Sequence, residues 1–132
     1  MARANSMTVR ILLIDDHALF RESVARLLTA EPGFEVVAAC SSGAEALRVL
    51  KSCEADMILL DLDLGPERGA DFLDRLRMES FRPKILLVTA GVSQSEVPNL
   101  IRKGISGIFM KHGSPASLIQ GIREAMEGRA VF

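Results

Sequence analysis

The sequence predicts an α/β fold in which a five-stranded parallel sheet carries helices on both faces, and three observations predict it. Short apolar runs alternate with segments of helical periodicity along the whole chain. Most of these runs are continuously apolar, as in strands that helices cover on both sides. The 132 residues, 48% of them hydrophobic, suffice for one sizeable core, without an internal repeat or long linker. Right-handed crossovers then give a doubly wound (βα)5 sheet.

The first strand is expected over residues 9–14, VRILLI. In the helix after it, apolar residues recur at the spacing of one helical face, at Leu19, Phe20, Val24, Leu27 and Leu28. The tripeptide Glu31-Pro32-Gly33 ends this helix before the second strand, residues 36–40. Ser42 with Glu45 three residues later is a capping box, which predicts the start of the second helix.

The third strand is expected over residues 57–60, and the helix after it contains Phe72, Leu73 and Leu76. The fourth strand is expected over 85–88. The next helix should begin near Ser93 to Ser95, with Pro98 in its first turns, where a missing N–H is tolerated. The fifth strand is expected over 105–110. Ser114-Pro115 should begin the last helix, and Gly128 should end it.

Composition excludes several classes of function. Lys plus Arg total 16 and Asp plus Glu total 17, which gives a net charge of −1. This charge provides no overall electrostatic attraction to nucleic acid or to an anionic membrane. No apolar run approaches the roughly 20 residues of a membrane span, and the N-terminus lacks the apolar core of a signal peptide. A cytoplasmic location is therefore expected. Cys40 and Cys53 have no metal-binding or CxxC spacing and are interpreted as small hydrophobic residues.

Polar residues stand at the carboxyl ends of the expected strands, where open parallel sheets bind ligands. They are Asp15, Asp16, Asp61, Thr89 and Lys111. Taken singly, each has an ordinary explanation as a turn residue, a helix cap or a surface charge. Three carboxylates at one edge repel each other, however, and a divalent cation such as Mg²⁺ would relieve that repulsion. A hydroxyl and an ammonium nearby suit phosphoryl oxygens, so the set predicts a phosphoryl-transfer pocket with an aspartate as acceptor.

The motifs LIDDH, LLDLDLG with Gly69 eight residues after Asp61, LLVTA and GIFMKHGSP resemble the receiver domain of bacterial two-component response regulators. The resemblance covers residues 8–128 and leaves 1–7 as an N-terminal extension and 129–132 as the start of a linker or C-terminal tail. The stretches DDHALFRESVARLL and GISGIFMKHGSPASLIQGIREAMEG most resemble receivers of the NarL/FixJ type, which usually carry a LuxR-type helix-turn-helix after them. The resemblance implies a flavodoxin-like sandwich and a signalling switch rather than a conventional enzyme.

The same resemblance implies a role for each carboxylate. Asp61 would be the phosphoacceptor and a ligand of Mg²⁺. Asp16 would bind Mg²⁺ directly, Asp15 would bind it largely through water, and the backbone carbonyl of Asp63 would be the remaining protein ligand. The Asp63 carboxylate is expected to face the rim of the pocket.

For the other pocket residues, the resemblance implies contacts with the phosphoryl group. Thr89 would hydrogen-bond a phosphoryl oxygen, and Lys111 would pair with the phosphoryl group and with Asp61. Backbone N–H groups at Asp63 and Ala90 would complete the cradle. His17 is interpreted as the residue that begins the first helix rather than as a ligand or base.

Three positions depart from the family pattern. Gly65 stands where many receivers have proline, with Pro66 after it, and Arg68 replaces an acidic or amide residue. Ile108 stands where a switching tyrosine or phenylalanine is usual. Phe109 is one step later and should face the opposite side of the sheet, so it is not expected to substitute.

An alternative is a haloacid dehalogenase-like phosphatase, because DLDLG resembles its D-x-D-x-T/V motif, with Asp61 as nucleophile and Asp63 as general acid and base. Against it, the acidic pair comes first in the chain, Gly65 replaces threonine or valine, and little room remains for a cap domain.

The receiver resemblance implies a sensor histidine kinase or a small phosphodonor as partner, and no membrane partner. A phosphorylation-favoured homodimer is expected through the fourth or fifth helix, or through the first with the fifth. This chain alone should not bind nucleic acid, and DNA binding would come from a C-terminal helix-turn-helix in the parent protein.

Overall fold

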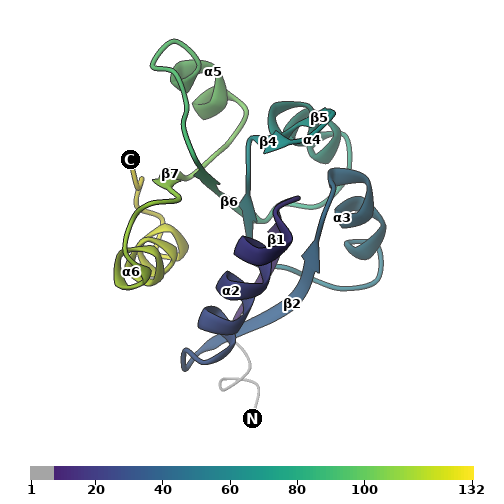
Figure 1. Ribbon diagram of the computed structural model, residues 1–132. Coiled ribbons are helices and arrows are strands. Elements are labelled where there is room, and N and C mark those ends of the chain that lie inside the picture. The colour runs from purple at the N-terminus through teal and green to yellow at the C-terminus, as the bar shows by residue number, and fades with distance from the viewer. Residues whose placement is uncertain (1–7) are drawn as a thin grey trace.

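The computed structural model describes residues 8–132, which form one parallel sheet between two layers of helices (Figure 1). The extension expected over 1–7 lies outside the described residues. The strands of this sheet are β1 (Val9–Ile14), β2 (Phe34–Cys40), β3 (Met57–Leu60), β6 (Lys84–Thr89) and β7 (Gly107–Met110). The helices are α2 (Ala18–Thr29), α3 (Gly43–Val49), α4 (Gly69–Arg77), α5 (Val97–Arg102) and α6 (Pro115–Met126). The predicted five-stranded parallel sheet is confirmed.

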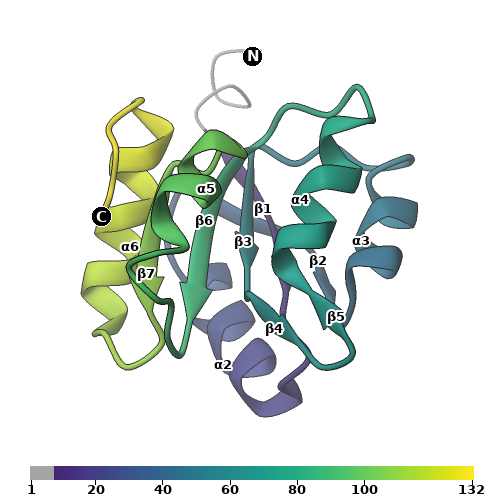
Figure 2. The ribbon, with the colours of Figure 1, turned by 90° about the horizontal axis from the view of Figure 1, so that it is seen from above.

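Different helices cover the two faces of the sheet (Figures 1 and 2). On one face, α2 and α6 pack through residues such as Leu28 and Ile122. On the other face, α3, α4 and α5 pack through Ala46, Phe72 and Leu100. Because each side of a strand meets a helical layer, the buried residues in the middle of the central strands are apolar, which explains the continuous runs in the sequence. Within the described part of the chain, no helix has both the length and the apolar character needed to cross a membrane.

The strand order is β2-β1-β3-β6-β7, so the chain first builds outward from β1 to β2 and then crosses back past β1 to β3. Ligands in such sheets bind outside the carboxyl ends of the strands, at the point where the order reverses. That point lies between β1 and β3, where Ile14 is in register with Leu60 and Leu60 with Leu87. The acidic residues that follow β1 and β3 therefore leave the sheet side by side.

The capping box at the start of α3 is present with one difference. The Ser42 hydroxyl accepts a hydrogen bond from the Glu45 N–H at 3.1 Å, as predicted. The Glu45 carboxylate, however, accepts from the N–H of Ser41 at 2.9 Å rather than from that of Ser42. Both side chains therefore accept hydrogen bonds from backbone N–H groups at the helix start. The bond to Glu45 comes from one residue earlier in the chain than in the usual capping box.

The start expected for the fourth helix near Ser93 to Ser95 was wrong, because α5 begins at Val97. Residues 94–96 form a turn instead, in which the Glu96 N–H donates to the Ser93 carbonyl at 3.1 Å. The Glu96 carboxylate also accepts from the Ser93 N–H and hydroxyl at 3.2 and 3.0 Å. These local bonds hold a turn where a helix was expected. Pro98 then lies in the first turn of α5, where its missing N–H costs little.

A short antiparallel hairpin follows β3 and was not expected from the sequence. Its strands are β4 (Asp63–Leu64) and β5 (Glu67–Arg68). Gly65 in its loop has a φ of +75°, a conformation that glycine adopts without steric cost. The hairpin returns the chain so that the Gly69 N–H donates to the Leu62 carbonyl at 2.8 Å. Strands of two residues carry no measurable periodicity, so sequence patterns miss them.

Candidate functional site

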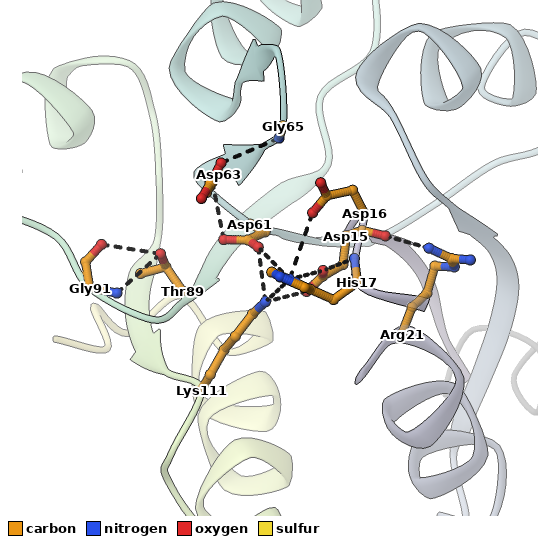
Figure 3. A network of polar contacts seen from close by, with 10 residues as sticks. All are labelled: Asp15, Asp16, His17, Arg21, Asp61, Asp63, Gly65, Thr89, Gly91 and Lys111. Carbon is orange, nitrogen blue, oxygen red and sulfur yellow. Dashed lines mark hydrogen bonds and ion pairs between the residues drawn. The ribbon is translucent and has the colours of Figure 1, made fainter. Parts of the chain in front are cut away.

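Asp15 and Asp61 are buried at the carboxyl edge of the sheet, directly after β1 and β3. Their exposed fractions are 5% and 2%, whereas Asp16 is exposed at the mouth of the pocket. The Asp61 N–H donates to the Ile14 carbonyl at 3.0 Å, which ties the two strand ends together. One ligand atom each from Asp15, Asp16, Asp61 and His17 lies within 4.8 Å of the others (Figure 3). The three carboxylates expected at this edge are thus brought together.

Lys111 reaches into this cluster from the end of β7. Its Nζ atom lies 2.9 Å from an Asp61 oxygen and 3.0 Å from an Asp15 oxygen, and its side chain is 14% exposed. Burial by itself would lower the pKa of Lys111, but the hydrogen bonds to Asp61 and Asp15 and their negative charges outweigh burial and raise it. The ammonium also lies 4.6 Å from the centre of the Phe20 ring. It is therefore held charged against the two buried carboxylates.

His17 precedes α2 as its N-cap, in line with the interpretation that it begins the first helix. Its N–H donates to the Asp15 carboxylate at 2.8 Å. Its Nδ1 atom lies 3.1 Å from Lys111 Nζ, a contact that sequence reasoning missed because the two residues are 94 positions apart.

Thr89 and Asp63 flank Asp61 but make local hydrogen bonds (Figure 3). The buried Thr89 hydroxyl donates to the Gly91 carbonyl at 3.2 Å and accepts from the Gly91 N–H at 3.4 Å. The Asp63 N–H donates to an Asp61 oxygen at 3.2 Å, and its own exposed carboxylate accepts from the Gly65 N–H at 3.3 Å. Asp63 therefore presents its backbone to Asp61 and its carboxylate to the rim.

Arg21 is a further positioning residue that the sequence interpretation missed. From the first turns of α2 its guanidinium donates to the backbone carbonyl of Asp15 at 2.7 Å. This bond fixes the backbone between the two aspartates. Only the i+4 spacing from His17 along α2 could have signalled that Arg21 faces the pocket.

The residues next to the pocket show how the departures from the family pattern are accommodated. The Arg68 guanidinium bonds the Glu96 carboxylate at 3.4 Å, which links the hairpin to the turn before α5. Ile108 packs against the hydrophobic cluster on the α3–α5 side of the sheet, whereas Phe109 packs on the α2–α6 side. The prediction that Phe109 faces away from Ile108 is confirmed.

The donor set fits a hard divalent cation. Three carboxylates converge, two of them buried and one open to solvent, and carboxylate oxygens with room for water are the ligands that Mg²⁺ prefers. Lys111 bridges two of the carboxylates and leaves Asp16 without the ammonium as a partner. The three carboxylates of the cluster therefore carry more negative charge than the one ammonium balances.

The match that identifies the family covers most of the chain. Residues 11–123 match the family of response regulator receiver domains. The chain belongs to this family. This receiver is 36% identical over 123 residues to the nitrate/nitrite response regulator protein NarP of Escherichia coli. The aligned region covers 93% of this chain and 57% of that protein. The haloacid dehalogenase alternative is set aside by this assignment.

Solved structures place the receiver in the same group. A two-component response regulator of the LuxR family from Aurantimonas has a TM-score of 0.87 at 31% identity, over 95% of this chain and 89% of that one. The receiver domain of a NarL response regulator from Mycobacterium tuberculosis has a TM-score of 0.84 at 29% identity, over 92% and 98% of the two chains. The predicted NarL/LuxR-type receiver is thereby confirmed. The chain spans less than two thirds of the length of the curated relatives it matches.

Proposed function

We propose that the receiver is phosphorylated on Asp61 and that the acyl phosphate switches the output of a transcription regulator. The orientation of the Asp61 carboxylate carries this proposal. One oxygen accepts from Lys111 Nζ at 2.9 Å and the other from the Asp63 N–H at 3.2 Å. Both donors are in place before the reaction, so they hold the attacking carboxylate in one orientation.

In the proposed step, an Asp61 oxygen attacks the phosphorus of the donor. An oxygen–phosphorus bond forms, the bond from phosphorus to the leaving group breaks, and an acyl phosphate results. Lys111 and the Asp63 N–H would contact the negatively charged oxygens of the transferred phosphoryl group. When bound by Asp16, by Asp15 largely through water, by Asp61 and by the Asp63 carbonyl, Mg²⁺ would neutralise phosphoryl oxygens.

Thr89 is the residue through which phosphorylation would act on α5. Its hydroxyl bonds with Gly91 are 3.2 and 3.4 Å long, at the weak end of the usual range. A phosphoryl oxygen, aided by the N–H of Ala90, would be a stronger, charged acceptor and would draw the hydroxyl inward. The loop 90–96 and its Arg68–Glu96 contact would follow. Phosphorylation can shift the equilibrium between the inactive and active conformations only by the difference in their contact free energies with the phosphoryl group.

The proposed partners are a sensor histidine kinase or a small phosphodonor, with the cytoplasm as the compartment. A homodimer favoured by phosphorylation would use α5 or α6, or α2 with α6. The α2–α6 choice has support from a groove of about 250 Å³ between these helices and from Leu19 of α2, which is 82% exposed. The domain would extend over 8–128, with 129–132 starting a linker to a DNA-binding helix-turn-helix in the parent protein.

Labelling by acetyl phosphate with Mg²⁺ tests the acceptor. Asp61→Asn should abolish the acid-labile label, because the attacking oxygen is lost. Asp63→Asn is the matched control and should keep most of the label, because only a rim carboxylate changes. Robust labelling of the Asp61 variant would overturn the proposal.

Thermal unfolding tests the metal site. Mg²⁺ binding to the folded form should raise the melting temperature by mass action, because it relieves the repulsion among the carboxylates. The rise should shrink in Asp16→Ala. An unchanged melting temperature at millimolar Mg²⁺, together with no heat of binding, would count against a metal site.

Sedimentation with and without beryllofluoride and Mg²⁺ tests the output. The mass should rise toward that of a dimer when the phosphoryl mimic is bound, and the isolated chain should not retard DNA. Measurable DNA affinity of this chain would contradict the proposal that DNA binding belongs to a C-terminal helix-turn-helix. An unchanged mass at high concentration would remove the dimer and leave Asp61 as the acceptor.

A further inference from the structure

The chain turns back after α6 and runs along the open edge of β7 (Figure 1). Gly128, with a φ of +90°, permits the reversal. The Val131 N–H donates to the Ser106 carbonyl at 3.0 Å, and the Val131 carbonyl accepts from the Ile108 N–H at 2.8 Å. Val131 thereby forms a parallel bridge with Gly107. Residues 130–132 are called the strap below.

Two glycines on different elements make room for the strap. A Cβ on Gly107 would lie 2.1 Å from the Val131 carbonyl oxygen, and its three nearest atoms would all belong to Val131. A Cβ on Gly121 of α6 would lie 3.5 Å from the Val131 side chain. That side chain packs into the α2–α6 cluster together with Phe109 and Met126. The strap therefore fits closely in two ways: its backbone lies against Gly107, and the Val131 side chain packs against α6.

The strap covers backbone groups that would otherwise be exposed. β7 is the last strand in the order of the sheet, so the Ile108 N–H and the Ser106 carbonyl point away from β6. Unpaired groups on a sheet edge are a template for any extended segment. In this structure the chain supplies that segment itself.

The strand that the strap holds also contacts the residues of the proposed switch. Lys111 at its end bonds Asp61 through Nζ, and its N–H donates to the Thr89 carbonyl at 2.9 Å. Ile108, whose N–H bonds the strap, and Val92, in the loop after Thr89, both pack against the α3–α5 hydrophobic cluster. A phosphoryl group on Asp61 would replace the Lys111–Asp61 contact and pull on Thr89. It would therefore act on β7 at its end, three residues after Ile108, whose N–H bonds the strap.

We propose that the edge of β7 is a strand-binding site for the strap, occupied when Asp61 is unphosphorylated and vacated when Asp61 is phosphorylated. This inference rests on the proposed phosphorylation of Asp61. Release frees residues 130–132, where the linker is expected to begin, and so carries the state of Asp61 to the chain that follows. Because coupling is reciprocal, weakening the strap must favour the phosphorylated form by the same factor. We expect a factor of about five to ten, at the lower end of usual couplings.

The rate of amide hydrogen exchange at Ile108 reports whether the strap is bound, because the Ile108 N–H donates to the Val131 carbonyl. Val131→Pro removes the N–H that donates to Ser106, and Gly107→Ala places a methyl group against the Val131 carbonyl. Phe132→Ala is the matched control, because its side chain is 60% exposed and the backbone bonds remain. Without beryllofluoride, the Ile108 amide should exchange at least about tenfold faster in Val131→Pro and Gly107→Ala than in the natural sequence or in Phe132→Ala. The Ser106 N–H donates to Ile85 of β6 at 2.7 Å and should stay protected throughout.

Beryllofluoride with Mg²⁺ then tests the coupling. It should speed Ile108 exchange in the natural sequence, and it should bind Val131→Pro and Gly107→Ala about five- to tenfold more tightly than Phe132→Ala. If beryllofluoride binds, as its own fluorine signal reports, while Ile108 exchange and the affinities stay unchanged, the strap proposal fails and the proposed function stands. If the natural sequence does not bind beryllofluoride at all, both fail.

Discussion

At Gly69, the first residue of α4, a single methyl group would press on the backbone of the proposed phosphoacceptor. A Cβ there would lie 2.6 Å from the Asp61 carbonyl oxygen and 2.8 Å from the Leu62 Cα atom. Ordinary contact begins at 3.4 Å, so the backbones must separate by about 0.8 Å, the difference between 3.4 and 2.6 Å. Such overpacking costs about 1–3 kcal/mol. The higher helix propensity of alanine offsets less than about 1 kcal/mol of this.

Gly69→Ala should therefore lower the free energy of unfolding by about 1–2 kcal/mol, which for a domain of this size lowers the melting temperature by about 3–10 °C. The displaced Asp61 carboxylate should also be phosphorylated about 10- to 100-fold more slowly, because the contact with Lys111 is misplaced. Calorimetry and the initial rate of labelling by acetyl phosphate measure the two effects.

Gly91→Ala is the matched control for stability. A Cβ on Gly91 meets no atom within 4 Å, and its φ is not positive. Its free energy of unfolding should stay within about 0.5 kcal/mol of that of the natural sequence. If Gly69→Ala is as stable as Gly91→Ala and is labelled at the natural rate, the close approach of α4 to the Asp61 backbone does not constrain the site.

Three further predictions concern residues outside the pocket. Asp56→Asn should cost about 1 kcal/mol at pH 7, because the Asp56 carboxylate accepts from the Arg10 N–H and guanidinium at 2.8 to 3.1 Å. Partial burial by itself would raise the pKa of Asp56, but the hydrogen bonds from Arg10 outweigh it and lower that pKa. The stabilisation is thus present above the unfolded pKa of about 3.9 and is lost as the pH falls through the folded value, so urea unfolding should show the Asp56→Asn difference shrinking at pH 3. Burial raises the pKa of Cys40 to about 11, so a thiol reagent at pH 8 should label Cys53 well before Cys40 in the folded protein, and similar rates would contradict this. Phe72 is 0% exposed, so Phe72→Ala should cost about 3–5 kcal/mol in urea unfolding, and a cost under about 1 kcal/mol would refute its role in the core.

The sequence by itself determined the five strands of the main sheet, the helices that alternate with them and the class of protein. Continuous apolar runs predict strands covered on both faces, because both sides of each strand must meet a helix. Breakers and caps such as Ser42 and Ser114 predict where helices start, because they satisfy N–H groups that the helix cannot. The polar residues after the strands could be chosen as the candidate site because carboxyl ends of parallel strands share one edge. These signals are local, and each is readable without knowing the partner of any residue.

The tertiary structure alone decided the contacts between distant residues. The strand order sets β1 beside β3, which brings the acidic residues together, and it joins His17 to Lys111 across 94 positions. The hairpin at Gly65 and the late start of α5 depend on hydrogen bonds of a few residues that no periodicity records. The bridge between Gly107 and Val131 exists only because α6 returns the chain to the edge of β7. Such contacts depend on how two surfaces pack, and neither surface alone carries that information in its sequence pattern.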